Sequence, residues 1–332
     1  MRREGSMEDK RTPINKGNFS LDTPEREAIF ELYRSEGWET DYRAYREAWT
    51  EYPRKQIIAD YPLLVDTELS SLCNLKCPMC YTITEEFKKK IKATLMDYSL
   101  FQKIIDEITG KVPALRLSLR GEPTLHPHFI DCIRYAKENG IGEVSFLTNG
   151  STLTSDVFTE IMQAGADWIT ISLDGMDETY EHIRKPLKFR ETLSKIVSAR
   201  NIKEKAGSHK PVIKVQSIWP AIRENTEHYY NTLMPYVDLI AFNPLIDYLG
   251  NDQDIIYMDS FICPQHYQRL VIASDGQALM CANDPVNMEP VGNAATESIY
   301  SIWHGPRLTE MREMHKNNLF QSIPVCRKCY LT

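Results

Sequence analysis

Hydrophobic residues recur along most of the chain in short runs that alternate with longer segments of helical periodicity. From Leu63 onward, the short runs are rich in Val, Ile and Leu, and the segments between them carry apolar residues three or four positions apart. This alternation is typical of repeated strand and helix units around a parallel sheet. The predicted strands span residues 63–69, 114–119, 143–147, 168–173, 212–218 and 237–242, with helical stretches such as 98–108 between them.

Six units are fewer than the eight of a closed barrel. We therefore expect an α/β fold, a partial (βα)6 TIM-like barrel at residues 61–254, with functional loops at the carboxyl ends of its strands. Residues 1–20 are predicted to be a flexible tail. Residues 21–60 are predicted to be a helical segment, whose stripe of Tyr42, Tyr45, Trp49 and Tyr52 packs on the barrel.

The alternation stops near residue 254. Residues 255–332 are predicted to form a small separate domain, with a hairpin over 270–280 around Asp275-Gly276 and a helix near 307–316.

Composition narrows the class of protein. The 332 residues carry 39 Lys and Arg against 46 Asp and Glu, a net charge of -7, which disfavours nucleic acid or anionic lipid as a partner. The chain shows neither a long apolar span nor the apolar core of a signal peptide, so we expect a cytoplasmic protein and no membrane. In a reducing compartment, eight cysteines, seven of them in two groups, indicate metal or redox chemistry more than disulfides.

The first cysteine group follows the first predicted strand. Cys73, Cys77 and Cys80 have C-x3-C-x2-C spacing, so three thiolates can converge from one loop. A structural zinc ion usually takes four protein ligands, whereas three cysteines on a four-iron cluster leave one iron open to another ligand. An iron–sulfur cluster with an open iron is favoured, with zinc as the alternative.

The segment from Cys73 to Cys80 resembles the cysteine motif of the radical SAM superfamily. The resemblance implies a [4Fe-4S] cluster whose open iron binds the amino and carboxylate groups of S-adenosylmethionine. Electron transfer from the reduced cluster then yields a 5'-deoxyadenosyl radical, which abstracts a substrate hydrogen. It also implies an external reductant such as flavodoxin or ferredoxin.

Further segments resembling the family's cofactor-binding motifs lie at the ends of later strands. Gly121-Glu122-Pro123 resembles the GGEP motif, with Arg120 in place of its first glycine, and its carboxylate suits the methionine ammonium group. An isolated Asn-Gly or Asp-Gly pair is equally explained by turn chemistry. By resemblance, the cofactor-binding candidates are Met79, Gly121, Glu122, Asn149, Ser172 and Arg184, with Gln216 and Ser217 as further donors.

The second cysteine group lies near the carboxyl terminus. Cys263 and Cys281 enclose a C-x12-G-x4-C pattern through Gly276, and Cys326 and Cys329 follow as C-x2-C. The pattern resembles the start of the SPASM domain, an auxiliary iron–sulfur extension of radical SAM enzymes. Four ligands suffice for one fully ligated [4Fe-4S] cluster, as in the shortened Twitch version. A tetrahedral zinc site is the alternative.

A fully ligated cluster is suited to accepting an electron, which favours a net oxidation by a radical SAM oxidoreductase. Asp247 and Tyr248, beyond the sixth strand, are the predicted catalytic residues, as general-base candidates, and Trp219 and Asn243 are candidates to shape the pocket. Epimerisation is an alternative that would need a hydrogen donor, either a cysteine or a tyrosine. Cys132, the remaining cysteine, falls on the apolar face of a predicted helix.

The expected substrate is a sugar, nucleotide-sugar or aminocyclitol. Modification of a peptide or protein is the close alternative. A metal-stabilised binding protein without enzymatic activity is the remaining hypothesis.

Overall fold

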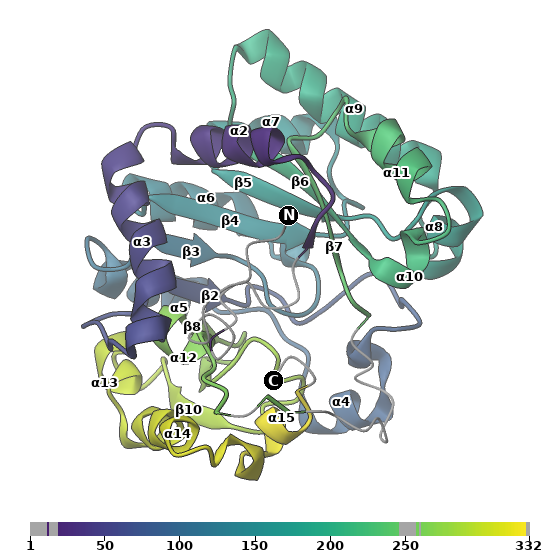
Figure 1. Cartoon of the computed structure of the whole chain (residues 1–332). Helices are drawn as coiled ribbons and strands as arrows, with labels where there is room; N and C mark the ends of the chain where they lie inside the picture. The colour runs from purple at the N-terminus through teal and green to yellow at the C-terminus, as the bar shows by residue number, and fades with distance from the viewer. Residues whose placement is uncertain (1–11, 13–18, 246–256, 259, 330–332) are drawn as a thin grey trace.

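The computed structural model describes residues 12, 19–245, 257–258 and 260–329. A ten-stranded sheet runs through both halves of the chain in the order β1-β7-β6-β5-β4-β3-β2-β8-β9-β10. Figure 1 shows this sheet curving around an interior, with helices on its outer side. Most of the predicted tail lies outside the described residues.

All six predicted strands are present and neighbours pair in parallel, which confirms the partial barrel. They are β2 (Leu64–Thr67), β3 (Ala114–Arg116), β4 (Glu143–Thr148), β5 (Trp168–Ser172), β6 (Val212–Ile218) and β7 (Leu239–Asn243). The intervening helices are α4 (Glu85–Lys90), α5 (Tyr98–Ile108), α6 (Phe129–Glu138), α7 (Ser155–Gln163), α8 (Asp177–Ile183), α9 (Phe189–Ala206), α10 (Trp219–Ile222) and α11 (Thr226–Leu233).

Alternate residues of each strand face opposite sides of the sheet. In β6, Ile213 and Val215 are buried in the main hydrophobic core, whereas Lys214 and Gln216 line an interior cavity. Because successive side chains in a strand point to opposite faces, an apolar outer face and a polar inner face follow directly from this sequence.

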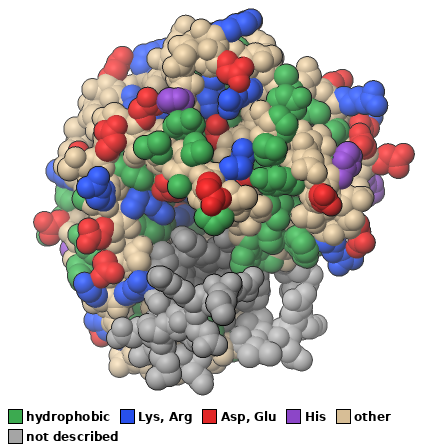
Figure 2. All heavy atoms as spheres, turned by 45° about the horizontal axis from the view of Figure 1, so that its top comes forward, with side chains coloured by type: hydrophobic (Ala, Val, Ile, Leu, Met, Phe, Trp, Pro, Cys, Tyr) green, Lys and Arg blue, Asp and Glu red, His purple; other side chains and the backbone are tan. Residues whose placement is uncertain are grey.

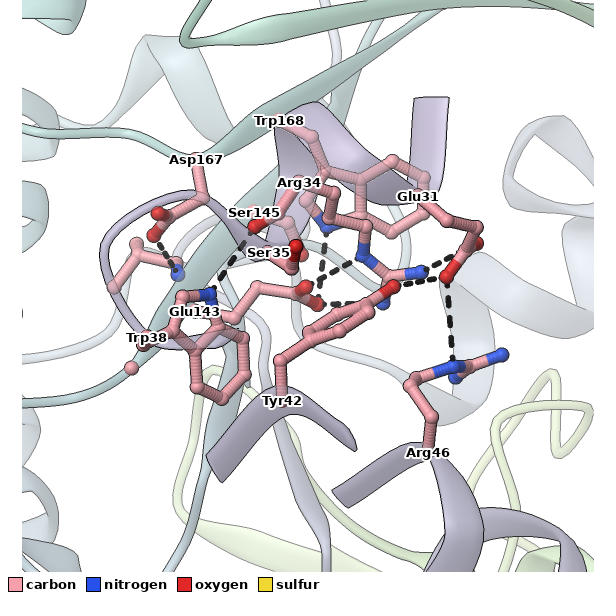
Figure 3. A network of polar contacts seen from close by, with 12 residues as sticks. Glu31, Arg34, Ser35, Trp38, Tyr42, Arg46, Glu143, Ser145, Asp167 and Trp168 are labelled. Carbon is pink, nitrogen blue, oxygen red and sulfur yellow. Dashed lines mark hydrogen bonds and ion pairs between the residues drawn. The ribbon is translucent and has the colours of Figure 1, made fainter. Parts of the chain in front are cut away.

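The amino-terminal segment forms two helices, α2 (Pro24–Ser35) and α3 (Glu39–Lys55), that pack against the amino ends of the strands (Figure 1). As predicted, Tyr42, Tyr45 and Trp49 are buried; they pack against Leu63, Leu64 and Ala114. Beside them, Arg34 of α2 makes a bidentate ion pair with Glu143 of β4, with Nε–Oε2 and Nη2–Oε1 distances of 2.5 and 2.8 Å (Figure 3).

The carboxyl-terminal part differs from its prediction in one respect. The expected hairpin is present as β8 (Arg269–Ile272) and β9 (Gln277–Leu279), but β8 also pairs in parallel with β2 and extends the barrel sheet by a strand. Leu270, Val271 and Ile272 are all buried, as a strand covered on both faces requires.

The other elements are short. They are β1 (Phe19–Ser20), antiparallel to β7, and α12 (Gln265–Gln268), β10 (Pro290–Asn293), α13 (Ile299–Trp303), α14 (Pro306–Lys316) and α15 (Pro324–Arg327). The boundary predicted between residues 254 and 255 lies outside the described residues. Among the described helices, none has the length and apolar character needed to span a membrane.

We predict that Arg34→Met lowers the free energy of unfolding by about 3 kcal/mol or more, because it leaves the Glu143 carboxylate buried without its ionic partner. Urea unfolding of the cluster-loaded protein measures this change. Lys90→Gln, which breaks an exposed ion pair with Glu86, is the control and should cost less than about 1 kcal/mol. Equal losses in the two variants would contradict the role assigned to the buried pair.

Candidate active site

The three cysteines of the first group lie on the loop that follows β2. Cys77 is buried, Cys80 is partly buried and Cys73 is exposed. Partial loss of hydration raises the pKa of Cys73, and burial raises the pKa of Cys77 to about 11; Cys80 adds to both increases, and Cys73 adds to that of Cys77. The thiols of this loop therefore influence one another electrostatically.

The segment that resembles GGEP is packed directly on this loop. The Glu122 amide donates to the Leu72 carbonyl at 2.8 Å. Gly121 has a φ of +64°, and a Cβ atom placed there would lie 2.6 Å from the Leu72 carbonyl oxygen and also collide with the Ser70 carbonyl oxygen. Only glycine allows this approach without displacing the backbone.

The Glu122 carboxylate is buried and surrounded by donors. Its Oε1 accepts hydrogen bonds from the hydroxyls of Thr124 and Thr148 at 2.6 and 2.7 Å, and its Oε2 accepts from the Asn149 amide at 2.7 Å. Burial raises the pKa of Glu122, and these hydrogen bonds oppose the increase because they stabilise the charged form. Its charge also contributes to the raised pKa of Cys73.

Asn149 connects the end of β4 to the cysteine loop. Its Nδ2 donates to Asn74 Oδ1 at 2.9 Å and contacts Cys73 Sγ at 3.9 Å. Cys73, Glu122 and Asn149, which are far apart in sequence, therefore lie together at the carboxyl ends of the strands.

Arg184, a candidate to bind the cofactor carboxylate, is paired with the buried carboxylate of Asp174. Its Nη2 and Nε lie 2.5 and 2.7 Å from Asp174 Oδ2, and Asp174 Oδ1 accepts from the Ile218 amide. The guanidinium also lowers the pKa of Cys77, against the larger effect of burial, which places Arg184 near the cysteine loop.

Ser172, which ends β5, is buried, and Met79 is partly buried in the loop. The cofactor-binding roles of Met79, Gly121, Glu122, Asn149, Ser172 and Arg184 stay predictions.

Arg120, the departure from the family's glycine, has a definite structural role. Its Nε and Nη2 pair with the two oxygens of Glu68 at 2.7 and 2.8 Å, and its Nη1 donates to Asn287 Oδ1 at 2.8 Å. Both side chains of the ion pair are almost fully buried. Arg120 thus connects the backbone that precedes Gly121 to the carboxyl-terminal region.

In the second cysteine group, Cys263, Cys281 and Cys326 are buried and Cys329 is partly buried. The Asn283 amide lies 3.2 Å from Cys281 Sγ. His315, which sequence reasoning missed, places its Nε2 3.6 Å from Cys326 Sγ. The sequence does not indicate that His315 lies near Cys326, because His315 shares a helix face with buried apolar residues and only the fold brings it to the cysteine.

A cavity of about 430 Å³ occupies the barrel interior. Leu119 and Leu147 line it just before the Glu122 and Asn149 segments, and Gln265 and Asn283 line it just after Cys263 and Cys281. Other lining residues are Asp66, Arg116, Ser118, Ser145, Thr170, Lys214, Gln216, Asn243 and Arg269. Many of these lining residues are the polar positions that alternate with apolar ones along the strands, and this alternation can be recognised in the sequence.

The remaining candidates are placed as follows. Asp247 and Tyr248 lie outside the described residues, so their catalytic roles stay predictions. Asn243 lines the cavity, whereas Trp219 packs on Phe242 with ring centroids 4.8 Å apart. Cys132 is fully buried in α6.

Comparison with known proteins agrees with these observations. Residues 67–231 match the Radical SAM superfamily, and residues 263–330 match SPASM, an iron–sulfur cluster-binding domain. The chain is 28% identical over 319 residues to the tungsten-containing aldehyde ferredoxin oxidoreductase cofactor-modifying protein of Pyrococcus furiosus, covering 80% of this chain and 86% of that protein. It is 31% identical to the mycofactocin maturase MftC of Mycobacterium tuberculosis, over 35% of this chain and 28% of that protein.

Solved structures share the fold. BtrN in complex with AdoMet and 2-DOIA aligns with a TM-score of 0.56 and 16% identity, over 82% of this chain and 94% of BtrN. SuiB of Streptococcus suis bound to S-adenosylmethionine aligns with a TM-score of 0.58 and 14% identity, over 93% of this chain and 88% of SuiB.

A partial barrel with three loop cysteines beside a buried glutamate defines a class of enzyme that binds an iron–sulfur cluster and S-adenosylmethionine together. This chain belongs to the radical SAM superfamily and carries an auxiliary iron–sulfur cluster domain. The resemblance noted in the sequence is thereby confirmed.

The cysteines fit the cofactors that this family binds. The three loop cysteines would supply three ligands of a [4Fe-4S] cluster, so that its fourth iron would remain open to S-adenosylmethionine. Four further cysteines, three of them buried, would supply a ligand set made of protein side chains alone. Among the described residues, no three Cys, His, Asp or Glu side chains are placed to hold a single metal ion. A four-iron cluster distributes its ligands over four metal atoms instead.

We predict that Cys73→Ala abolishes formation of 5'-deoxyadenosine, because it removes a ligand of the first cluster, whereas Cys326→Ala spares this reaction. Iron, sulfide and 5'-deoxyadenosine are measured after anaerobic reconstitution. Each variant should retain about four irons per chain. Loss of the first cluster in both variants would contradict the division into two independent cysteine groups.

We also predict that Gly121→Ala weakens binding of S-adenosylmethionine by at least about tenfold, because the new Cβ displaces the Glu122 segment from the cysteine loop. Equilibrium binding to the cluster-loaded protein measures this. Gly110→Ala is the matched control, since Gly110 has a similar φ of +70° but open space around its Cβ position. Equal weakening in both variants would show that backbone strain alone is responsible.

Proposed function

We propose that the chain oxidises a small polar molecule, a sugar, nucleotide-sugar or aminocyclitol, inside the barrel cavity. The observation that carries the proposal is the position of that cavity. Its wall contains Leu119 and Leu147, which precede the segments packed on the first cysteine loop, and Gln265 and Ala282, which lie close in sequence to Cys263 and Cys281. Its volume of about 430 Å³ is within the range of small-molecule sites.

When bound, the first cluster supplies the electron that cleaves S-adenosylmethionine to a hydrogen-abstracting radical, and the second supplies an acceptor for the electron released by the substrate. The residues of the chain bind and orient the substrate. Hydroxyl and amide side chains from neighbouring strands line the cavity and can hydrogen bond to substrate hydroxyl groups: Ser118, Ser145, Thr170, Gln216 and Asn243. A reductant such as ferredoxin or flavodoxin completes the proposed system.

The location of Cys132 supports oxidation over epimerisation. Seven cysteines are assigned to the two groups, and Cys132 is fully buried among apolar residues of the core rather than lining the cavity. Burial also raises the pKa of its thiol. No described cysteine outside the two groups is therefore placed to return a hydrogen atom to a substrate radical.

A second candidate function is modification of an enzyme cofactor. It is favoured by the relative from Pyrococcus furiosus, whose name describes such an activity and whose match covers most of both chains. The match to the maturase MftC spans about a third of this chain and supports peptide modification less.

The proposal is tested with the reconstituted enzyme, a reductant, S-adenosylmethionine and a panel of sugars, nucleotide-sugars and aminocyclitols. We expect a carbonyl product formed together with 5'-deoxyadenosine, and about eight irons and eight sulfides per chain. Cys281→Ala should lose product formation but retain slow cleavage of S-adenosylmethionine. About four irons plus one zinc, or an epimerised product, would contradict oxidation.

Cys132→Ala is the matched cysteine control and should form the same product. If Cys132→Ala retains both clusters but loses turnover, hydrogen return by a thiol becomes the better explanation.

A further inference from the structure

The deep part of the barrel cavity concentrates positive charge. Its described lining contains five cationic side chains against two carboxylates, a formal excess of three positive charges: Arg34, Arg46, Arg116, Lys214 and Arg269 against Asp66 and Glu143. On the outer face shown in Figure 2, acidic and basic side chains are interspersed instead. The chain as a whole has a net charge of -7, so the described lining of the cavity differs in sign from the chain as a whole.

The two carboxylates are both engaged. Glu143 pairs with Arg34 through both oxygens. Asp66 forms ion pairs with two guanidinium groups: its Oδ2 lies 3.1 Å from Arg269 Nη1, and its Oδ1 lies 3.7 Å from Arg116 Nε. Among the described residues, Asp66 Oδ1 and Arg269 Nε have no hydrogen-bond partner although both atoms are buried. Hydrogen-bonding capacity therefore remains at this end of the cavity.

The cations are held close together around one aromatic ring. The Trp168 ring centroid lies 4.7 Å from Arg34 Cζ, 5.9 Å from Lys214 Nζ and 6.0 Å from Arg116 Cζ. Figure 3 shows Arg34, Glu143 and Trp168 at this end of the barrel. Arg116 keeps 32% of its side-chain surface accessible while it lines the cavity, so its guanidinium can be reached from inside the barrel.

Crowding of these charges is electrostatically unfavourable in the absence of an anion. Burial, together with repulsion from Arg116 and Arg34, lowers the pKa of Lys214 to about 7. Burial, together with repulsion from Arg269, also lowers the pKa of Arg116. An anion placed among these groups would relieve the repulsion and replace the hydration that they lose on burial.

We propose that the cavity binds its substrate through an oxyanion group, a phosphate or a carboxylate, held by Arg116, Lys214 and Arg269. This inference rests on the proposed function and specifies its substrate class. The three cations lie within the first three residues of their strands, whereas the cysteine loop follows the carboxyl end of β2. An anion held there directs the remainder of the substrate toward the carboxyl ends of the strands, where the radical is formed.

The test measures anion binding to the cluster-loaded enzyme saturated with S-adenosylmethionine, so that sites for the cofactor carboxylate are already filled. Inorganic phosphate and succinate are titrated by calorimetry, with sodium chloride at equal ionic strength as the reference. We expect phosphate or succinate to bind, and the stronger of the two identifies the group. Arg116→Gln and Lys214→Met should each weaken binding by at least about tenfold, because each removes a charge-assisted hydrogen bond.

Arg190→Gln, on the exposed surface of α9, is the matched control and should bind the anion as the unaltered enzyme does. Iron content shows whether each variant has folded. Two cavity variants are used so that, if one of them does not fold, the other still tests the inference. Absence of anion binding, or equal binding in all variants, overturns the inference. Formation of 5'-deoxyadenosine by the unaltered enzyme then shows whether the proposed function survives without it.

Discussion

The buried ion pair between Glu68 and Arg120 is the interaction on which the arrangement of the two cysteine groups depends. Glu68 follows β2 and accepts hydrogen bonds from the Arg120 guanidinium, from the Arg120 amide and from the Ser274 amide that follows β8. A carboxylate this deeply buried is tolerated only when its oxygens are satisfied. Three chain segments are therefore fixed relative to one another: the start of the cysteine loop, the Gly121-Glu122 turn and the carboxyl-terminal hairpin.

This constraint explains how the chain uses an arginine where the family has a glycine. Arg120 does not face the cavity; its Nη1 reaches Asn287 in the carboxyl-terminal region. At the position where the family has a glycine, Arg120 therefore connects the barrel to the carboxyl-terminal region. Gly121 retains the left-handed backbone conformation that brings Glu122 against Leu72, so the turn is preserved although one glycine is lost.

The local parts of the structure were predictable from the sequence, and the long-range parts were not. Strands and helices followed from hydrophobic period, and the Cys73, Cys77 and Cys80 spacing identified the first cluster loop, because these signals lie within a few residues of one another. The pairing of β8 with β2 joins residues about 200 positions apart, and local patterning carries no register information over that separation. The Arg184–Asp174 pair and the His315–Cys326 contact likewise depend on side-chain directions that only the fold defines.

The described lining of the cavity comes from three parts of the chain. Arg34 comes from the amino-terminal helices, Arg116 and Lys214 from the barrel strands, and Arg269 from β8. The Radical SAM match at residues 67–231 includes Arg116 and Lys214 but neither Arg34 nor Arg269. A relative that is similar only in the barrel therefore shares the residues of the radical SAM match but not all of the charged residues that line the cavity. At the proposed substrate site, the flanking segments therefore contribute charged groups that the motifs defining the family do not include.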